Sequence, residues 1–181
     1  GLAMAAIYGE ASEHAKRLAS LDNAYDALLE ARRRGVDTSH YETEDPDFFR
    51  LMVEAAVYQF FVASGSSSAL EENAFYADEV NYFGKEKTGR RFMLDDQQRY
   101  RQRYPQRLFK PREIGAITGS ESDGYQTRVV IDYWLADPQK SNNIKVDRPD
   151  GELSLEIGFG FDDSHRLKIV LIANSEPKPQ L

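Results

Sequence analysis

The sequence predicts an α+β fold in which N-terminal helices pack on a strongly curved antiparallel sheet and form a cone-shaped half-barrel with it. In the N-terminal half, apolar residues recur mainly at three- and four-residue steps, which is typical of helices. From residue 108 onward they alternate with polar residues, which is typical of strands with one buried face. Helices followed by antiparallel strands pack on one face of the sheet, and a bent sheet leaves one end open as a pocket.

Three helices are predicted. The first covers residues 10–34, where Leu and Tyr recur at helical spacing, and Gly35 ends it. The second begins at Asp45-Pro46, because Asp is a favoured N-cap and Pro suits the first helical position. The third covers residues 90–103 and is broken by Pro105.

Strands fill most of the remainder. Residues 76–83 form the first strand, which Gly84 closes, and a capping-box spacing at residues 68–71 opens a short turn of helix before it. Gly158 and Gly160 mark a place where a later strand bends or is closely approached. The later strands are expected at 127–135, 152–161 and 167–173, with hairpin loops at 120–124 and 162–164.

Composition excludes several classes of function. The chain of 181 residues has a net charge of -7, which argues against nucleic-acid binding. The basic run at residues 32–34 suits a helix C-terminus capped by Gly35, and the alternative is a phosphate-binding patch. Without cysteine, and with His14, His40 and His165 far apart, the sequence predicts no metal site. Nucleotide-binding glycine loops are missing too, so we expect no cofactor.

The N-terminus suggests export. Residues 2–7 are small and apolar, and Ala3-Met4-Ala5 fits a signal-peptidase pattern, so we expect a periplasmic or exported protein and otherwise a cytoplasmic one. No stretch is long and apolar enough to span a membrane. We divide the chain into an N-terminal helical extension (1–44), one domain (45–175) and a frayed tail (176–181).

Two motifs point to a family. Residues 76–84 read Tyr-Ala-Asp-Glu-Val-Asn-Tyr-Phe-Gly, and the helix that follows contains Leu-Asp-Asp-Gln-Gln-Arg-Tyr before it ends in Arg103-Tyr104-Pro105. This resembles bacterial domains of the NTF2-like superfamily, most strongly over residues 76–109, with Tyr104 where Trp is usual. The resemblance implies a cystatin-like cone with a pocket between sheet and helices. The superfamily includes isomerases, dehydratases, transport adaptors and accessory domains, so fold analogy alone does not select a function.

Candidate site residues follow from the alternation along residues 76–83. Asp78 and Tyr82 share a face, so Asp78 is a candidate base and Tyr82 a candidate hydrogen-bond donor, as in the ketosteroid isomerases that the fold resembles. The alternative is that Asp78 caps a turn or pairs with an Arg at the strand edge. Aromatic residues with polar tips could line the pocket or belong to the core. The expected pocket-lining set is Tyr58, Phe61, Tyr82, Tyr100, Tyr104, Tyr133 and Phe159.

From these features we expect a non-catalytic binding or accessory module of a bacterial envelope-associated or exported protein. Its partner would be a small apolar molecule in the cone or another protein. One alternative is a ketosteroid-isomerase-like isomerase or dehydratase with a pocket carboxylate, with Tyr82 or Tyr100 as donor. The other is a dimeric assembly subunit, a homodimer formed through the sheet with Val130, Trp134 and Val170 on its outer face.

Overall fold

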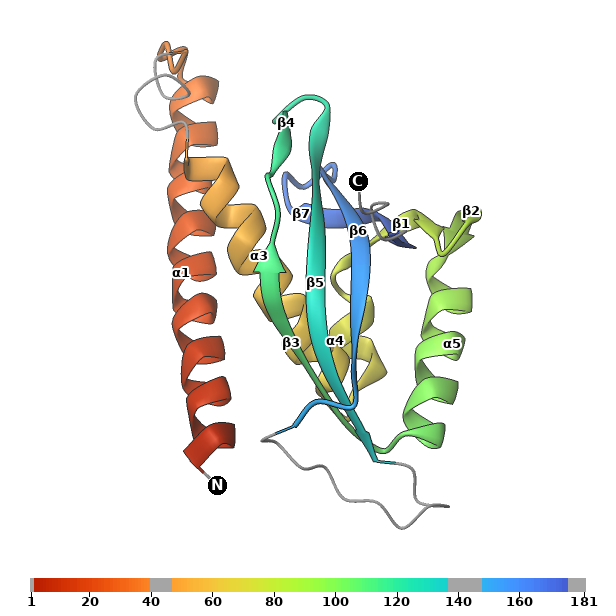
Figure 1. Ribbon diagram of the computed structural model, residues 1–181. Coiled ribbons are helices and arrows are strands. Elements are labelled where there is room, and N and C mark those ends of the chain that lie inside the picture. Colours follow the sequence, from red (N-terminus) through yellow and green to blue (C-terminus); the bar gives the residue numbers. More distant parts are fainter. Residues whose placement is uncertain (1, 40–46, 137–147, 176–181) are drawn as a thin grey trace, which may run out of the picture.

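The computed structural model describes residues 2–39, 47–136 and 148–175, and shows helices packed against one curved sheet (Figure 1). The α+β prediction is confirmed. The helices are α1 (Leu2–Arg33), α3 (Phe48–Gly65), α4 (Ala69–Asn73) and α5 (Arg90–Arg103). The strands are β1 (Tyr76–Tyr82), β2 (Lys85–Gly89), β3 (Gln106–Ile114), β4 (Thr118–Ser120), β5 (Gly124–Ala136), β6 (Gly151–Phe161) and β7 (Leu167–Asn174).

The sheet is mixed rather than wholly antiparallel. Its strand order is β2-β1-β7-β6-β5-β3, with β4 paired to β5. All neighbouring pairs are antiparallel except β1 and β7, which run parallel. A parallel pair needs a long crossover connection, and β2, α5 and strands β3–β6 lie between β1 and β7 in sequence. The predicted antiparallel sheet thus has one parallel pair, β1 with β7. In Figure 1 the long strands β3, β5 and β6 stand in front, and β7, β1 and β2 turn away behind them.

The curvature of the sheet has a local cause at β6. The pairing of β6 with β7 shifts register between Gly158 and Phe159, which is a β-bulge. A Cβ atom on Gly158 would lie 3.0 Å from the Cβ of Leu171, so the neighbouring strand approaches closely here. The prediction that Gly158 marks a bend or a close approach is confirmed.

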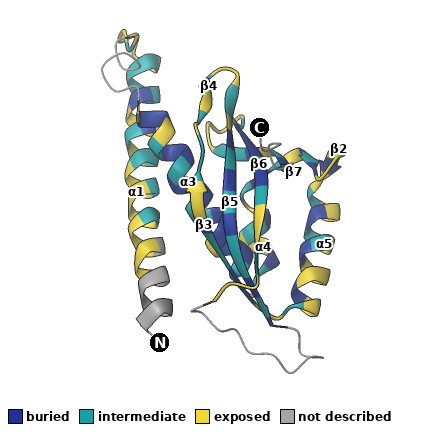
Figure 2. Cartoon of the chain, viewed as in Figure 1, coloured by how far each residue is buried: buried dark blue, intermediate teal, exposed yellow. Residues whose placement is uncertain are grey.

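Helix α3 is the central helix and is buried along most of its length, as dark blue in Figure 2 shows. Its buried side chains include Val53, Val57 and Phe60, which pack against the inner sheet residues Ile157 and Ile169. The predicted start at Asp45-Pro46 lies outside the described residues. Within them the helix begins after Asp47, whose carboxylate pairs with Arg50 (3.1 Å) instead of capping the backbone.

Helix α1 lies alongside α3 and ends as the sequence predicts (Figure 1). Gly35 adopts a φ of +80°, and the Val36 amide donates to the Ala31 carbonyl (3.0 Å), which closes the helix with a left-handed cap. Tyr25 and Leu28 pack against Phe49 in a second apolar cluster. The division at residue 44 stays a prediction, although this packing joins α1 to the domain.

A polar contact also fixes α1 to the loop between β4 and β5. Glu121 accepts hydrogen bonds from the Tyr25 hydroxyl (2.7 Å) and from Arg32 (2.6 and 3.0 Å). Burial raises the pKa of the Glu121 carboxyl, but the hydrogen bonds from Arg32 and Tyr25 outweigh it and hold that pKa below its ordinary range. The basic run at residues 32–34 therefore includes one structural anchor, Arg32.

We expect Glu121→Ala to lower the free energy of unfolding by about 1–3 kcal/mol, because it removes the acceptor of the buried Tyr25 hydroxyl and the carboxylate that pairs with Arg32. The pKa of Glu121 is lower in the folded protein than in the unfolded chain, so its contribution to stability is fully present above the unfolded pKa. That contribution is lost as the pH falls through the folded pKa. Urea unfolding at neutral and acidic pH measures both effects. A variant as stable as the wild type at neutral pH would contradict the anchor; Asp123→Ala in the same loop is the control.

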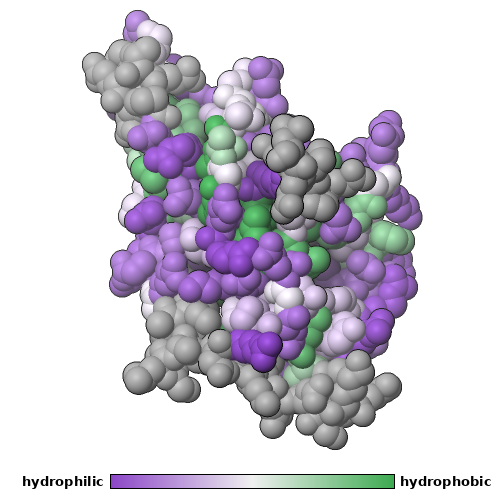
Figure 3. Space-filling view, viewed as in Figure 1, coloured by the Kyte–Doolittle hydropathy of each residue, from purple (hydrophilic) through white to green (hydrophobic). Residues whose placement is uncertain are grey.

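The outer face of the sheet is hydrophilic along its middle, as the purple band in Figure 3 shows. Arg112 on β3 pairs there with Asp132 (3.7 Å) and with Glu152. Trp134, predicted to offer an exposed apolar surface for dimerisation, is 4% exposed and cannot do so. Val170 is 39% exposed. A homodimer through the sheet stays a prediction.

Candidate functional site

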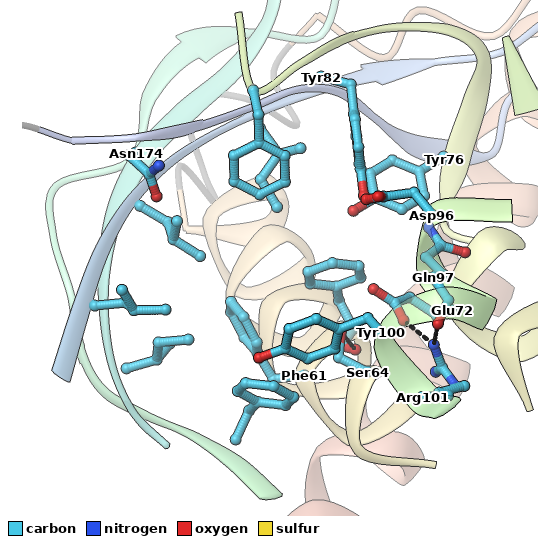
Figure 4. Close-up of a pocket in the computed structure, with 17 residues that line it drawn as sticks. Phe61, Ser64, Glu72, Tyr76, Tyr82, Asp96, Gln97, Tyr100, Arg101 and Asn174 are labelled. Atoms are coloured by element: carbon cyan, nitrogen blue, oxygen red, sulfur yellow. Dashed lines mark hydrogen bonds and ion pairs between the residues drawn. The ribbon is translucent and has the colours of Figure 1, made fainter. Parts of the chain in front are cut away.

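A pocket of about 300 Å³ opens between the helices and the inner face of the sheet (Figure 4). Helices α3, α4 and α5 supply one wall, and strands β1, β3, β5, β6 and β7 supply the other. Most of the lining is apolar or aromatic, which suits a small organic molecule. The apolar and aromatic lining residues are Phe60, Phe61, Tyr76, Tyr82, Phe83, Tyr100, Phe109, Ile131, Leu153, Leu155 and Ile172.

Polar side chains gather at the helical side of this pocket (Figure 4). Glu72, at the end of the short helix α4, forms an ion pair with Arg101 of α5 (2.7 Å). Only 14% of the Glu72 side chain and 9% of the Arg101 side chain are exposed, so the pair is nearly dry. Burial raises the pKa of the Glu72 carboxyl even though Arg101 acts in the opposite direction.

Arg101 also holds the helical wall together. It donates to the carbonyls of Ala63 (3.0 Å) and Ser66 (3.1 Å) at the C-terminal end of α3 and to the carbonyl of Gln97 (3.3 Å). Arg107 donates to the Ser64 carbonyl (3.3 Å) beside it. Carbonyls at a helix C-terminus lack partners within the helix, and cations there also suit the helix dipole. Arg101 is therefore committed to its own protein rather than free to bind an anion.

A second polar pair lies further along the same side. The Tyr82 hydroxyl donates to Asp96 Oδ2 (2.8 Å), and Arg99 lies 3.7 Å from Asp96 Oδ1. Burial, and then the bond to Asp96, raise the pKa of Tyr82, so it stays a neutral donor. The structure thus places Asp96 in the pocket wall.

Three of the seven residues predicted to line the pocket do so: Phe61, Tyr82 and Tyr100. Phe159 belongs to the core cluster instead. The ring of Tyr104 packs beside Tyr100 (5.2 Å between centroids) without lining the pocket, and the Tyr133 ring lies over Gly151. Tyr58 lies elsewhere, stacked on His14 (3.7 Å between ring centroids) beside a separate polar pocket formed by α3 and the β3–β4 connection.

Asp78 does not lie in the pocket. Its side chain is 94% exposed, and its carboxylate accepts a hydrogen bond from Arg90 (2.8 Å) at the edge of the sheet. The alternation that placed Asp78 beside Tyr82 fails because β1 loses its regular pairing with β7 between Tyr76 and Asn81. The prediction that Asp78 is a candidate base inside the cone is therefore wrong. Its alternative, an ion pair with an Arg at the strand edge, is what the structure shows.

The carboxylates that do line the pocket, Glu72 and Asp96, come from helices. Alternation along a strand does not report on acidic residues of a helix, so it predicts neither of them. The sequence does contain a signal for Asp96, since it lies four residues before Tyr100 and therefore near the same helix face. In the described parts of the chain, no group of three or more His, Asp or Glu side chains is placed to hold a metal ion. Nor does any described helix have the length and apolar character needed to cross a membrane.

Comparison by sequence finds no matching protein family and no matching curated protein. Comparison of structures gives clear matches. A scytalone dehydratase-like protein of Novosphingobium aromaticivorans is 13% identical with a TM-score of 0.59, over 77% of this chain and 99% of that one. A domain of unknown function with a cystatin-like fold from Nostoc punctiforme is 14% identical with a TM-score of 0.52, over 70% and 76%.

A third match, Rv3472 of Mycobacterium tuberculosis, has unknown function; it is 8% identical with a TM-score of 0.61, over 77% of this chain and 78% of that one. Identities this low show a shared fold alone. The chain therefore has a cystatin-like fold, which is the fold that the resemblance of residues 76–109 implies.

Proposed function

We propose that this protein is a binding module for a small, largely apolar molecule with one polar end, held in the pocket between sheet and helices. The observation that carries the proposal is the arrangement of the pocket wall. Apolar side chains from the sheet face the body of a ligand, and the polar side chains of α4 and α5 gather at the helical side (Figure 4).

The two carboxylates in the pocket wall both have partners, which supports a pocket that binds its ligand without reacting with it. Glu72 is neutralised by Arg101, and Asp96 already accepts a hydrogen bond from Tyr82. A group that acts as a base needs a free lone pair directed at the substrate proton. Partnered carboxylates instead give the pocket a fixed polarity. An accessory role in an exported protein, with a protein partner, remains part of the same proposal.

We expect one molecule of 2-naphthol, an apolar bicycle with one hydroxyl, to bind per protein chain. Burial in the pocket should shift its fluorescence, and naphthalene should displace it competitively. A fluorescence titration with both compounds measures this. Failure of 2-naphthol to saturate, or binding that naphthalene does not compete, would count against the pocket as the site.

A second candidate is an isomerase or dehydratase that works by proton transfer, and Glu72 is the observation in its favour. This carboxylate lines the pocket, is almost completely buried and has a raised pKa, as a general base requires. The scytalone dehydratase-like neighbour shares the fold and supports this candidate only by analogy. Tyr100 lines the same pocket and could serve as the hydrogen-bond donor to a substrate oxygen.

This candidate predicts exchange of carbon-bound protons. With 2-tetralone in heavy water, Glu72 would take the acidic proton next to the carbonyl and return a deuteron from solvent, and NMR would follow loss of that signal. Glu72→Gln should abolish the protein-catalysed exchange, with Glu71→Gln, exposed on the same helix, as control. Exchange no faster than in buffer, or unchanged in the Glu72 variant, would exclude Glu72 as the base.

A further inference from the structure

One polar side chain in the pocket wall has no partner. Gln97 of α5 is 3% exposed and lines the pocket, yet neither its amide nitrogen Nε2 nor its amide oxygen Oε1 has a hydrogen-bond partner among the described residues. Its backbone carbonyl is paired, since Arg101 donates to it (3.3 Å). The unpaired group is therefore the side-chain amide alone.

The two carboxylates beside Gln97 cannot satisfy both of its amide atoms. Figure 4 places its side chain between those of Asp96 and Glu72. Ionised carboxylates only accept hydrogen bonds, so each could pair with Nε2 but neither could donate to Oε1. Both amide atoms are also shielded from solvent. A buried amide without partners is unfavourable, and such groups in folded proteins call for a specific explanation.

We infer that the ligand of this pocket carries a hydrogen-bond donor and an acceptor side by side, as a primary carboxamide or a lactam does, and that Gln97 recognises that pair. An amide side chain presents its own donor and acceptor in one plane, so it can form two parallel hydrogen bonds with such a group. The inference holds whichever of the two atoms is the nitrogen, because both lack partners. It rests on the proposed function and names the ligand class of the same site.

This assignment also explains where the polar end of the ligand lies. Tyr82 is committed to Asp96 and Arg101 to Glu72, so these polar groups of the wall are already paired. Aliphatic side chains of the sheet lie across the pocket from them (Figure 4). A flat apolar ring system with a carboxamide at one edge fits this arrangement.

The test compares naphthalene with 2-naphthamide, which share a ring system and differ by the carboxamide. We expect the wild-type protein to bind 2-naphthamide about tenfold or more tightly than naphthalene. Gln97→Leu should remove that preference while it keeps naphthalene binding. Gln98→Leu, one residue along and exposed, should keep the preference. If the leucine variant fails to fold, Gln97→Met, of similar length and flexibility, replaces it.

Stability provides a second readout. If Gln97 serves a ligand, its replacement by Leu removes an unpaired buried amide, and the urea midpoint should be equal to or higher than that of the wild type. A lower midpoint in both Gln97→Leu and Gln97→Met would indicate a structural role and overturn the inference. The inference would also be overturned if the wild-type protein showed no preference for 2-naphthamide, or if that preference persisted in Gln97→Leu. If the protein binds naphthalene and 2-naphthamide equally tightly, this inference alone fails. If it binds neither compound, the proposed function fails as well.

Discussion

Replacement of Arg101 by methionine is expected to lower the free energy of unfolding by about 3–5 kcal/mol, the range for a buried ion pair that loses one partner. The change leaves Glu72 charged and buried, and it also removes the donors to the Ala63 and Ser66 carbonyls at the end of α3. Methionine keeps much of the bulk of the arginine side chain. The loss of stability therefore reflects the missing charge and hydrogen bonds rather than a cavity. Urea unfolding at neutral pH measures it.

The pH dependence of this variant is expected to have a defined sign. Burial raises the folded pKa of Glu72 above its unfolded value, so the folded protein binds that proton more tightly. Arg101 lowers this pKa in the wild type, so its loss should raise the pKa of Glu72 further in the variant. The variant therefore gains more stability than the wild type as Glu72 is protonated, and the deficit of Arg101→Met should shrink as the pH falls below neutral. The exposed Arg103→Met serves as control. A deficit below about 0.5 kcal/mol, within the range of surface substitutions, would contradict the role given to Arg101.

Closure of the pocket mouth is expected to have the largest effect on binding. Leu153 lines the pocket but is 40% exposed, so Leu153→Trp adds bulk over the opening with little disturbance of the core. We expect the affinity for 2-naphthol to fall at least tenfold, since a ring at the mouth competes with the ligand for the same volume. The free energy of unfolding should change by less than about 1 kcal/mol.

The matched control for this substitution is Val170→Trp on β7, where the replaced residue is 39% exposed and does not line the pocket. That variant should bind 2-naphthol as the wild type does. Equal loss of affinity in both variants would mean that the probe binds the outer sheet surface. If both variants kept the wild-type affinity for 2-naphthol, Leu153 would not border the route to the binding site.

The sequence predicts the regular elements well wherever their period is clean. The alternation over residues 152–161 is followed by β6, and Ser68 caps α4 through the amide of Glu71, as the capping-box spacing predicts. Strand β2 was missed because Lys-Glu-Lys-Thr-Gly is polar and short, and one residue in it, Thr88, is buried. Parallel pairing of β1 with β7 depends on contacts far apart in sequence, which no local pattern records.

The candidate site was harder to predict than the fold. Alternation places Tyr82 in the pocket correctly, but it places Asp78 there too, because a pattern of period two assumes regular pairing that β1 does not keep. The pair of Glu72 with Arg101 joins residues 29 positions apart and depends on how α4 meets α5. The unpaired amide of Gln97 is a property of the packed structure, and the sequence shows only a Gln on the buried face of a helix.

The most direct test of the central claim is a methyl NMR experiment that records which side chains contact bound 2-naphthol. The account predicts intermolecular Overhauser effects from the naphthalene protons to the methyl groups of Ile131, Leu155 and Ile172, which line the pocket. Contacts confined to exposed methyl groups, such as those of Leu70 and Val170, would contradict it, as would no contact at all at saturating concentration.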